Sequence, residues 1–216
     1  VEIKAFDLDG NGLMEVLMLF EDYLLALSWQ PFNHTFAIER YNSTSFGFSA
    51  EEKLVGLTFE ESLASLYLAS NISLVRCDLT GETLRVLEIL PNVLDGDRLR
   101  AIDSFYHNGV HKIAIIGSKS LYQYDFTQAN LEILLKTKYE TLDSLIVTNL
   151  DHQYEPEMLF GIRRVQKNRT VIEIIRADWK GLNPRWDFTV TQRRDEIAQI
   201  YDVGVGRLSS QNFKTL

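Results

Sequence analysis

The sequence predicts an all-β protein of the β-propeller class. The main evidence is a six-residue segment that occurs four times: two apolar residues, a small or polar one, a variable one, Ser or Asp, and a large apolar residue. The copies end at positions 29, 79, 126 and 179, so their ends are 50, 47 and 53 residues apart. Repeats of this length are typical of propellers, in which each repeat is one four-stranded sheet, or blade.

Three further short apolar runs accompany each copy, which gives four predicted strands per unit. The first runs are residues 3–6, 54–57, 99–102 and 145–147, the second are 16–19, 66–68, 113–116 and 158–160, and the fourth are 35–38, 84–89, 131–135 and 186–190. Period-two alternation punctuated by Gly, Asn and Asp, as at Asn108-Gly109, is the signature of hairpins. The Ser or Asp near the end of each third strand is expected to accept backbone N–H bonds in the following turn.

The predicted blades span residues 1–48, 49–95, 96–140 and 141–192, and a fifth begins within residues 193–216 with the run 197–200. Four blades and one strand do not close comfortably, so we expect a single propeller domain, or an excerpt of a larger ring of about seven blades. Ala5, Gly56, Ala101 and Ala198 are small residues where the innermost strand approaches a crowded axis.

A helical interpretation of residues 13–29 is disfavoured. Glu15, Glu21, Asp22 and Ser28 do not define a polar face with a 3.6-residue period, and no other repeat supports a helix there. Residues 51–54 are the one segment for which a short helical turn stays open.

Composition narrows the classes of function. A 45% hydrophobic share is enough for a full core, and the formal net charge of −8 argues against non-specific nucleic-acid binding. One Cys excludes a disulfide framework and a Cys-based metal site. No apolar run approaches the roughly 18 residues of a membrane helix, so no transmembrane segment is expected.

The most specific local motif is the acidic turn at residues 7–15. Asp7, Asp9, Asn11 and Glu15 offer side-chain oxygens, and Leu13 offers a backbone carbonyl, in the pattern of a calcium loop. The alternative is a turn that is simply held by hydrogen bonds from these side chains. An EF-hand is not expected, because its twelfth position is Met18.

With this turn between the first two strands, the chain resembles β-propellers of the FG-GAP or VCBS type. The turn is clear only in the first unit and has decayed in the others. The resemblance implies a binding platform such as those of adhesion receptors of the integrin-α kind, of secreted proteins, and of cytoplasmic coat subunits like those of the Bardet-Biedl complex.

Other candidate residues have plainer interpretations. Arg163, Arg164, Lys167 and Arg169, with Arg193 and Arg194 nearby, form a basic hairpin tip that either receives an acidic partner or is only solvated. The histidines, at 34, 107, 111 and 152, are interpreted as exposed turn residues. Trp29, Leu79, Phe126 and Trp179 share one repeat position and are expected to pack between blades. Of Tyr122 and Tyr124, only one is expected to face inward.

These observations favour a non-catalytic scaffold in the cytoplasm that binds other protein subunits of a complex, with no cofactor. The alternative is a secreted or lumenal adhesion module with calcium in the acidic turn. Its glycans would sit on the four Asn-X-Ser/Thr motifs at Asn33, Asn42, Asn71 and Asn168. An enzyme is the least favoured class, because no nucleophile elbow, Walker loop or dinucleotide fingerprint is present.

Overall fold

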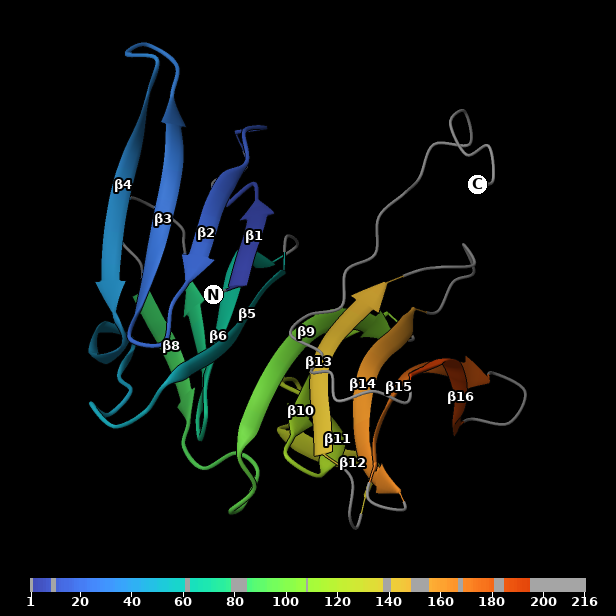
Figure 1. Cartoon of the computed structure of the whole chain (residues 1–216). Coiled ribbons are helices and arrows are strands. Elements are labelled where there is room, and N and C mark those ends of the chain that lie inside the picture. The colour runs from blue at the N-terminus through green and yellow to red at the C-terminus, as the bar shows by residue number, and fades with distance from the viewer. Residues whose placement is uncertain are drawn as a thin grey trace, which may run out of the picture.

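The computed structural model describes residues 2–8, 11–60, 63–78, 85–107, 109–137, 141–148, 156–166, 169–180 and 185–194. These residues form four four-stranded antiparallel sheets, each built from strands that are consecutive in the chain (Figure 1). Sheet 1 contains β1 (Glu2–Phe6), β2 (Glu15–Leu19), β3 (Tyr23–Gln30) and β4 (Thr35–Asn42). Sheet 2 contains β5 (Leu54–Glu60), β6 (Ser65–Ser70), β7 (Leu74–Asp78) and β8 (Arg85–Leu90).

The other two sheets follow the same order. Sheet 3 contains β9 (Leu99–His107), β10 (Val110–Gly117), β11 (Ser120–Asp125) and β12 (Asn130–Lys136). Sheet 4 contains β13 (Thr141–Thr148), β14 (Glu157–Gln166), β15 (Arg169–Lys180) and β16 (Arg185–Arg194). The predicted propeller class is confirmed, because four repeats give four meandering sheets of one topology. Residues 195–216, with the expected start of a fifth unit, lie outside the described residues.

The helical alternatives are settled by the same elements. Residues 13–29 contain β2 and β3, as predicted. For residues 51–54, which the sequence leaves open, the structure has no helical turn: Glu51 lies in a turn and Leu54 begins β5. One short 3-10 helix, η1 (Ser43–Phe46), instead follows β4 and is closed by Gly47 in the left-handed conformation.

Apolar clusters fill the space between successive sheets. Leu24 and Leu66 belong to the cluster between sheets 1 and 2. Leu74 and Ile113 belong to the cluster between sheets 2 and 3, and Leu121 and Phe160 to the one between sheets 3 and 4. Each interior sheet is therefore apolar on both faces, which is the packing of propeller blades.

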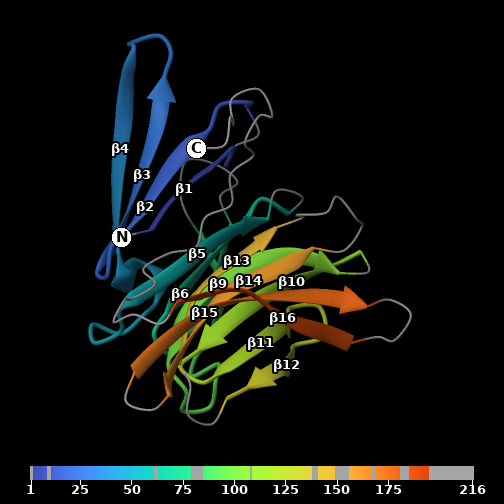
Figure 2. The ribbon, with the colours of Figure 1, turned by 45° about the vertical axis from the view of Figure 1, so that its right-hand side comes forward.

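The first strands of the sheets lie side by side at the inner end of this stack. β5 lies against β9 and β9 against β13, while the fourth strands are outermost (Figures 1 and 2). Gly56 shows how close the approach is. A Cβ placed on it would lie 3.0 Å from the backbone nitrogen of Ile102 and 3.1 Å from its Cγ1, so the predicted small residue is required here.

One carboxylate connects the inner strands of all four sheets. Asp103 on β9 accepts hydrogen bonds from Lys4 Nζ of β1 at 3.4 Å and from Thr58 Oγ1 of β5 at 3.1 Å. Its second oxygen accepts the backbone N–H of Val147 on β13 at 2.8 Å. Lys4 also donates to the carbonyl oxygen of Leu57 at 2.8 Å. The inner strands are thus joined by charge-assisted bonds as well as by packing.

We expect Asp103→Ala to lower the free energy of unfolding by about 3 kcal/mol, because several partly buried donors lose their acceptor at once. Urea unfolding followed by circular dichroism measures this loss. Asp22→Ala is the matched control, since Asp22 pairs with Lys53 in an exposed position and its loss should cost under about 1 kcal/mol. Equal losses in the two variants would contradict the role given to Asp103.

Candidate interaction surface

Sheet 1 has one face that no other sheet of the described residues covers. Leu17, Leu19 and Leu24 face sheet 2. Because successive side chains of a strand alternate between the two faces, their neighbours in sequence lie on the opposite face of sheet 1. On the uncovered side, apolar residues of neighbouring strands are paired in register and so form rows across the sheet. The rows are Ile3, Met18 and Leu25; Ala5, Val16, Leu27 and Ile38; and Trp29 with Phe36. We call this surface the open face. Ile3 is 60% exposed, Phe36 53% and Ile38 65%.

The repeat shows that the open face differs from its equivalents only in lacking a neighbour. Leu25 has the repeat position of Val75, Tyr122 and Ile175. Each of those three is buried against the preceding sheet. The open face therefore has the composition of a surface that is buried elsewhere in this molecule, so it requires a cover, which is either a further blade of the predicted larger ring or a partner protein.

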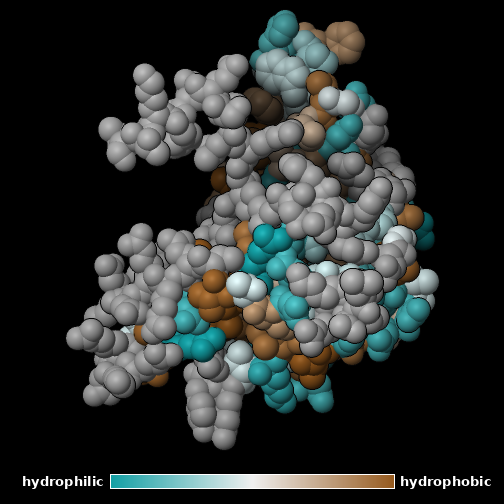
Figure 3. All heavy atoms as spheres, turned by 90° about the vertical axis from the view of Figure 1, so that its right-hand side faces the viewer, coloured by the Kyte–Doolittle hydropathy of each residue, from teal (hydrophilic) through white to brown (hydrophobic). Residues whose placement is uncertain are grey.

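The β3–β4 hairpin extends this surface away from the other sheets (Figures 1 and 2). Next to its turn Trp29 and Phe36 pack edge to face, with ring centroids 5.1 Å apart. At its turn Phe32 is 98% exposed. On the side of sheet 4, by contrast, the described hydrophobic and hydrophilic atoms alternate in small patches (Figure 3). Phe32 was not predicted from the sequence, although a large aromatic residue in a predicted link was the available signal.

The acidic turn is held by hydrogen bonds within itself. Asp7 Oδ2 accepts the N–H of Gly12 at 2.9 Å, and Asn11 Oδ1 accepts that of Leu13 at 2.7 Å. Glu15 Oε2 accepts the N–H of Leu8 at 2.8 Å. These bonds favour the hydrogen-bonded turn. The buried Asp7 Oδ1 accepts no hydrogen bond from the described residues, and it is the oxygen that a calcium ion would take first.

Asp9, the remaining predicted calcium ligand, lies outside the described residues. Within the described ranges no three His, Cys, Asp or Glu side chains are grouped as a metal site. The calcium site at Asp7, Asp9, Asn11, Leu13 and Glu15 therefore stays a prediction.

Two of the predicted basic residues lie along a strand rather than at the hairpin tip. Arg163 and Arg164 lie within β14, where they are paired in register with Ile172 and Val171 of β15. The Arg164 Nε atom lies 3.1 Å from Glu173 Oε2, so its charge is partly neutralised. Lys167 lies outside the described residues, and of Arg169 only the backbone is described.

Two histidines that were expected in exposed turns are in fact enclosed, so that interpretation was wrong. His107 is buried, with its ring centroid 4.3 Å from that of Trp179. His111 on β10 stacks on Tyr67, and its Nδ1 lies 3.0 Å from Glu60 Oε2. Gly109 lies in a turn between β9 and β10, as predicted, whereas Asn108 lies outside the described residues. Residues of neighbouring sheets cover these two strands. His34 is exposed as expected, and His152 lies outside the described residues.

Glu60 is the centre of this enclosed group. It is buried, and it accepts hydrogen bonds from Tyr67 at 3.1 Å and from Tyr106 at 2.5 Å. Burial lowers the pKa of His111 below its ordinary 6.5, in spite of the nearby Glu60 carboxylate. The group joins sheet 2 to sheet 3, and no sequence pattern marked it because its members come from two repeats.

Two aromatic expectations also need correction. Tyr122 and Tyr124 both face sheet 2 and are both buried, since residues two apart on a strand share one face. Phe126 and Trp179 pack against the clusters between sheets, as predicted. Trp29 belongs to none of these clusters, because no sheet in the described ranges lies on that side of sheet 1. Leu79 lies outside the described residues.

The comparisons with known proteins agree with this architecture. No protein-family model matches the chain, and no curated protein matches it in sequence. Among solved structures, a chain in the crystal structure of a nidogen/laminin complex is similar, with a TM-score of 0.56 and 11% sequence identity. The match covers 83% of this chain and 61% of that chain.

The chain folds as a β-propeller. At this level of identity the similarity concerns the fold alone. The propeller part of the sequence resemblance is therefore confirmed, whereas the FG-GAP or VCBS type stays a prediction. The chain spans about three fifths of the length of the similar chain. In the part that the structure describes, no helix is long and apolar enough to cross a membrane.

We predict that His111 makes the stability of the protein depend on pH. The unfolded chain takes up this proton near pH 6.5, whereas the folded chain does so only at lower pH. The stabilisation is thus complete above pH 6.5 and is lost as the pH falls through the lowered pKa, at up to about 1.4 kcal/mol per pH unit.

Urea unfolding of the wild type and of His111→Gln between pH 7.5 and 5 measures this effect. The wild type should lose more stability than the variant over that range. His34→Gln, which alters an exposed histidine, should behave as the wild type does. A wild type that becomes relatively more stable in acid would show that the Glu60 carboxylate outweighs burial.

Proposed function

We propose that the protein is a non-catalytic interaction module, a propeller subunit of a multiprotein complex. The observation that carries this proposal is the open face with its projecting aromatic hairpin. Contiguous exposed apolar surface of this kind is unusual outside interaction sites, and Trp and other aromatic residues are enriched where partner proteins bind most strongly. Among the kinds of protein that the family resemblance implies, the proposal places this one with the coat or trafficking subunits of the cytoplasm.

The mechanism is geometric. Hydrogen-bonded sheets fixed to one another by apolar clusters hold the open face and the hairpin in one arrangement. A partner that binds them need not order a flexible surface, and such preorganisation lowers the entropy cost of association. Partner proteins, rather than nucleic acid, suit a chain with a net charge of −8.

Affinity purification of the full-length parent protein from its native source tests the proposal. The wild type should retain a stoichiometric companion, and Ile38→Glu should retain at least about fivefold less, because it places a charge within the apolar contact. Val165→Glu is the matched control, since Val165 is an exposed apolar residue of sheet 4 and its change should have no effect.

Thermal unfolding of both variants would check that they remain folded. A parent protein that purifies without any companion would refute the proposed function. A companion that Ile38→Glu retains fully would show that the open face is not the contact.

The alternative function is a secreted or lumenal adhesion module with calcium and glycans. The exposed positions of Asn33 and Asn42 are compatible with glycans. Asn71 is less so, because its Oδ1 accepts the backbone N–H of Lys53 at 3.1 Å. Asp7 Oδ1 is the observation that favours calcium.

For a cytoplasmic subunit we expect that glycosidase leaves the mass of the native protein unchanged and that a chelator leaves its melting temperature unchanged. A ligand bound only by the folded state must raise stability, so a calcium site would appear as a chelator-sensitive melt. A loss of mass with glycosidase, together with a calcium-dependent melt that Asp7→Ala abolishes, would establish the alternative.

A further inference from the structure

A groove at the outer rim of sheets 2 and 3 has no role in the proposed function. Its volume is about 640 Å³, within the range of small-ligand sites. One wall is the segment that connects β8 to β9, and the other is formed by the β10–β11 turn with β11 and β12. Leu94 and Tyr122 lie in its interior, and Leu131 and the half-exposed Ile133 border it.

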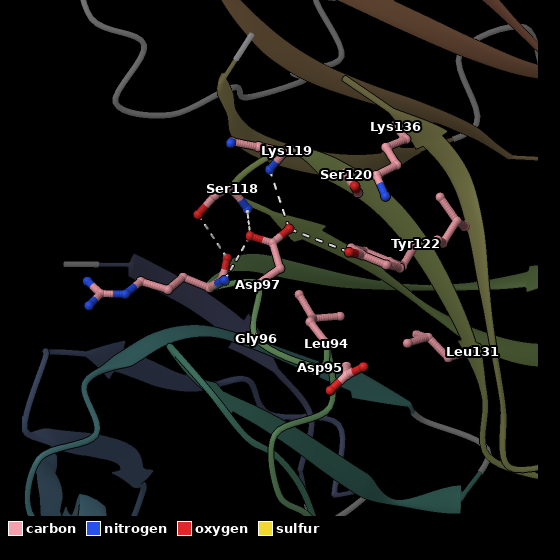
Figure 4. Close-up of a pocket in the computed structure, with 12 residues that line it drawn as sticks. Leu94, Asp95, Gly96, Asp97, Ser118, Lys119, Ser120, Tyr122, Leu131 and Lys136 are labelled. Carbon is pink, nitrogen blue, oxygen red and sulfur yellow. Dashed lines mark hydrogen bonds between the residues drawn. The ribbon is translucent and has the colours of Figure 1, made fainter. Parts of the chain in front are cut away.

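Asp97 fixes the two walls to each other. Its carboxylate accepts the N–H groups of Ser118 at 3.0 Å and Lys119 at 3.4 Å, and the hydroxyl of Tyr122 at 3.4 Å (Figure 4). The approach requires a glycine opposite, since a Cβ on Gly117 would lie 2.4 Å from Asp97 Oδ2. The groove is therefore a built feature of the fold, and the Asp97 charge is already satisfied by donors.

The cations of the groove are not satisfied in the same way. Among the described residues, the Lys119 and Lys136 ammonium groups form no ion pair, although the chain as a whole is acidic. Figure 4 shows both lysines along one side of the pocket and Asp95 across from them. Arg98 also lines the groove, as does Asp97 where the two walls meet. A ligand thus meets the two lysines on one side, apolar side chains in the middle and Asp95 on the other side.

A second, smaller groove of about 290 Å³ continues this surface on the other side of β12. Lys136 borders both grooves, and Arg164 of β14 and the half-exposed Val190 of β16 border the second. The fold thereby brings one of the basic residues predicted from sequence to the same rim as Lys136, which comes from another repeat.

We propose that the β12 rim, defined by Lys119, Tyr122, Ile133, Lys136, Arg164 and Val190, binds a short extended peptide segment of a partner protein in which carboxylates alternate with large apolar residues. The carboxylates pair with Lys119 and Lys136, and the apolar side chains cover Ile133 and Leu131. Alternation suits an extended segment, because successive side chains then point to opposite sides. This inference rests on the proposed interaction function but not on the open face.

Fluorescence polarisation with a labelled ten-residue peptide of alternating Glu and Leu tests the proposal. The wild-type protein should bind it saturably, and Lys119→Gln/Lys136→Gln should bind it about fivefold to tenfold more weakly, as expected for the loss of two partly exposed ion pairs. Lys53→Gln is the matched control, because it removes a lysine that already pairs with Asp22 on a distant surface. Added salt should weaken binding to the wild type more than to the double variant.

Two further peptides separate charge from apolar contact. Replacing every Glu by Gln should remove the difference between wild type and double variant, and replacing every Leu by Ser should weaken binding to both proteins. Equal affinity of wild type and double variant for the acidic peptide, or no saturable binding at all, would overturn the proposal. If the parent protein purifies without a companion but binds the peptide, the proposed complex is refuted and the rim site is supported. If it purifies with a companion but does not bind the peptide, only the rim site is refuted.

Discussion

Asp103 is the contact on which the arrangement of the sheets most depends. Apolar clusters hold each sheet to the next, but each cluster joins only two sheets and does not determine the position of a third. Asp103 touches the inner strand of every sheet, through Lys4, Thr58 and Val147. It is largely removed from water, where such charge-assisted bonds are strongest and where an unpaired partner is most costly. The arrangement of the blades is thus fixed by the hydrogen bonds of one side chain as well as by the apolar surface buried between neighbouring sheets.

The strands could be predicted from the sequence because the pattern of apolar residues along each strand reflects its burial, and this pattern occurs in all four repeats. A sheet between two others needs apolar residues on both faces, so Leu74 and Val75 are adjacent in sequence and buried in different clusters. The outer strands have only one covered face and alternate, as β8 does. Both patterns are visible in a single chain, and together they gave the class of fold.

The sites could not be predicted in the same way, because their members come from different repeats. Glu60 would be expected at a solvated strand end, yet Tyr106 and His111 of the next sheet enclose it. Trp29 shares its repeat position with Trp179, but only Trp179 has a sheet beside it. A repeat position predicts which face a residue is on. The neighbour that covers that face is decided by tertiary structure.

This distinction bears on the open face itself. Leu25, Leu27 and Ile38 follow the rule of an interior sheet, although their sheet is at the end of the described row. Covering apolar surface is worth about 25 cal/mol per Å², so a face of this width exposed to water forgoes stabilisation that the other three sheets obtain. Selection for solubility alone would favour polar residues there, such as Arg40, which is opposite Leu25 at the edge of the same face. The apolar rows are therefore best explained by a protein surface that packs against them, either a further blade of the predicted ring or a partner.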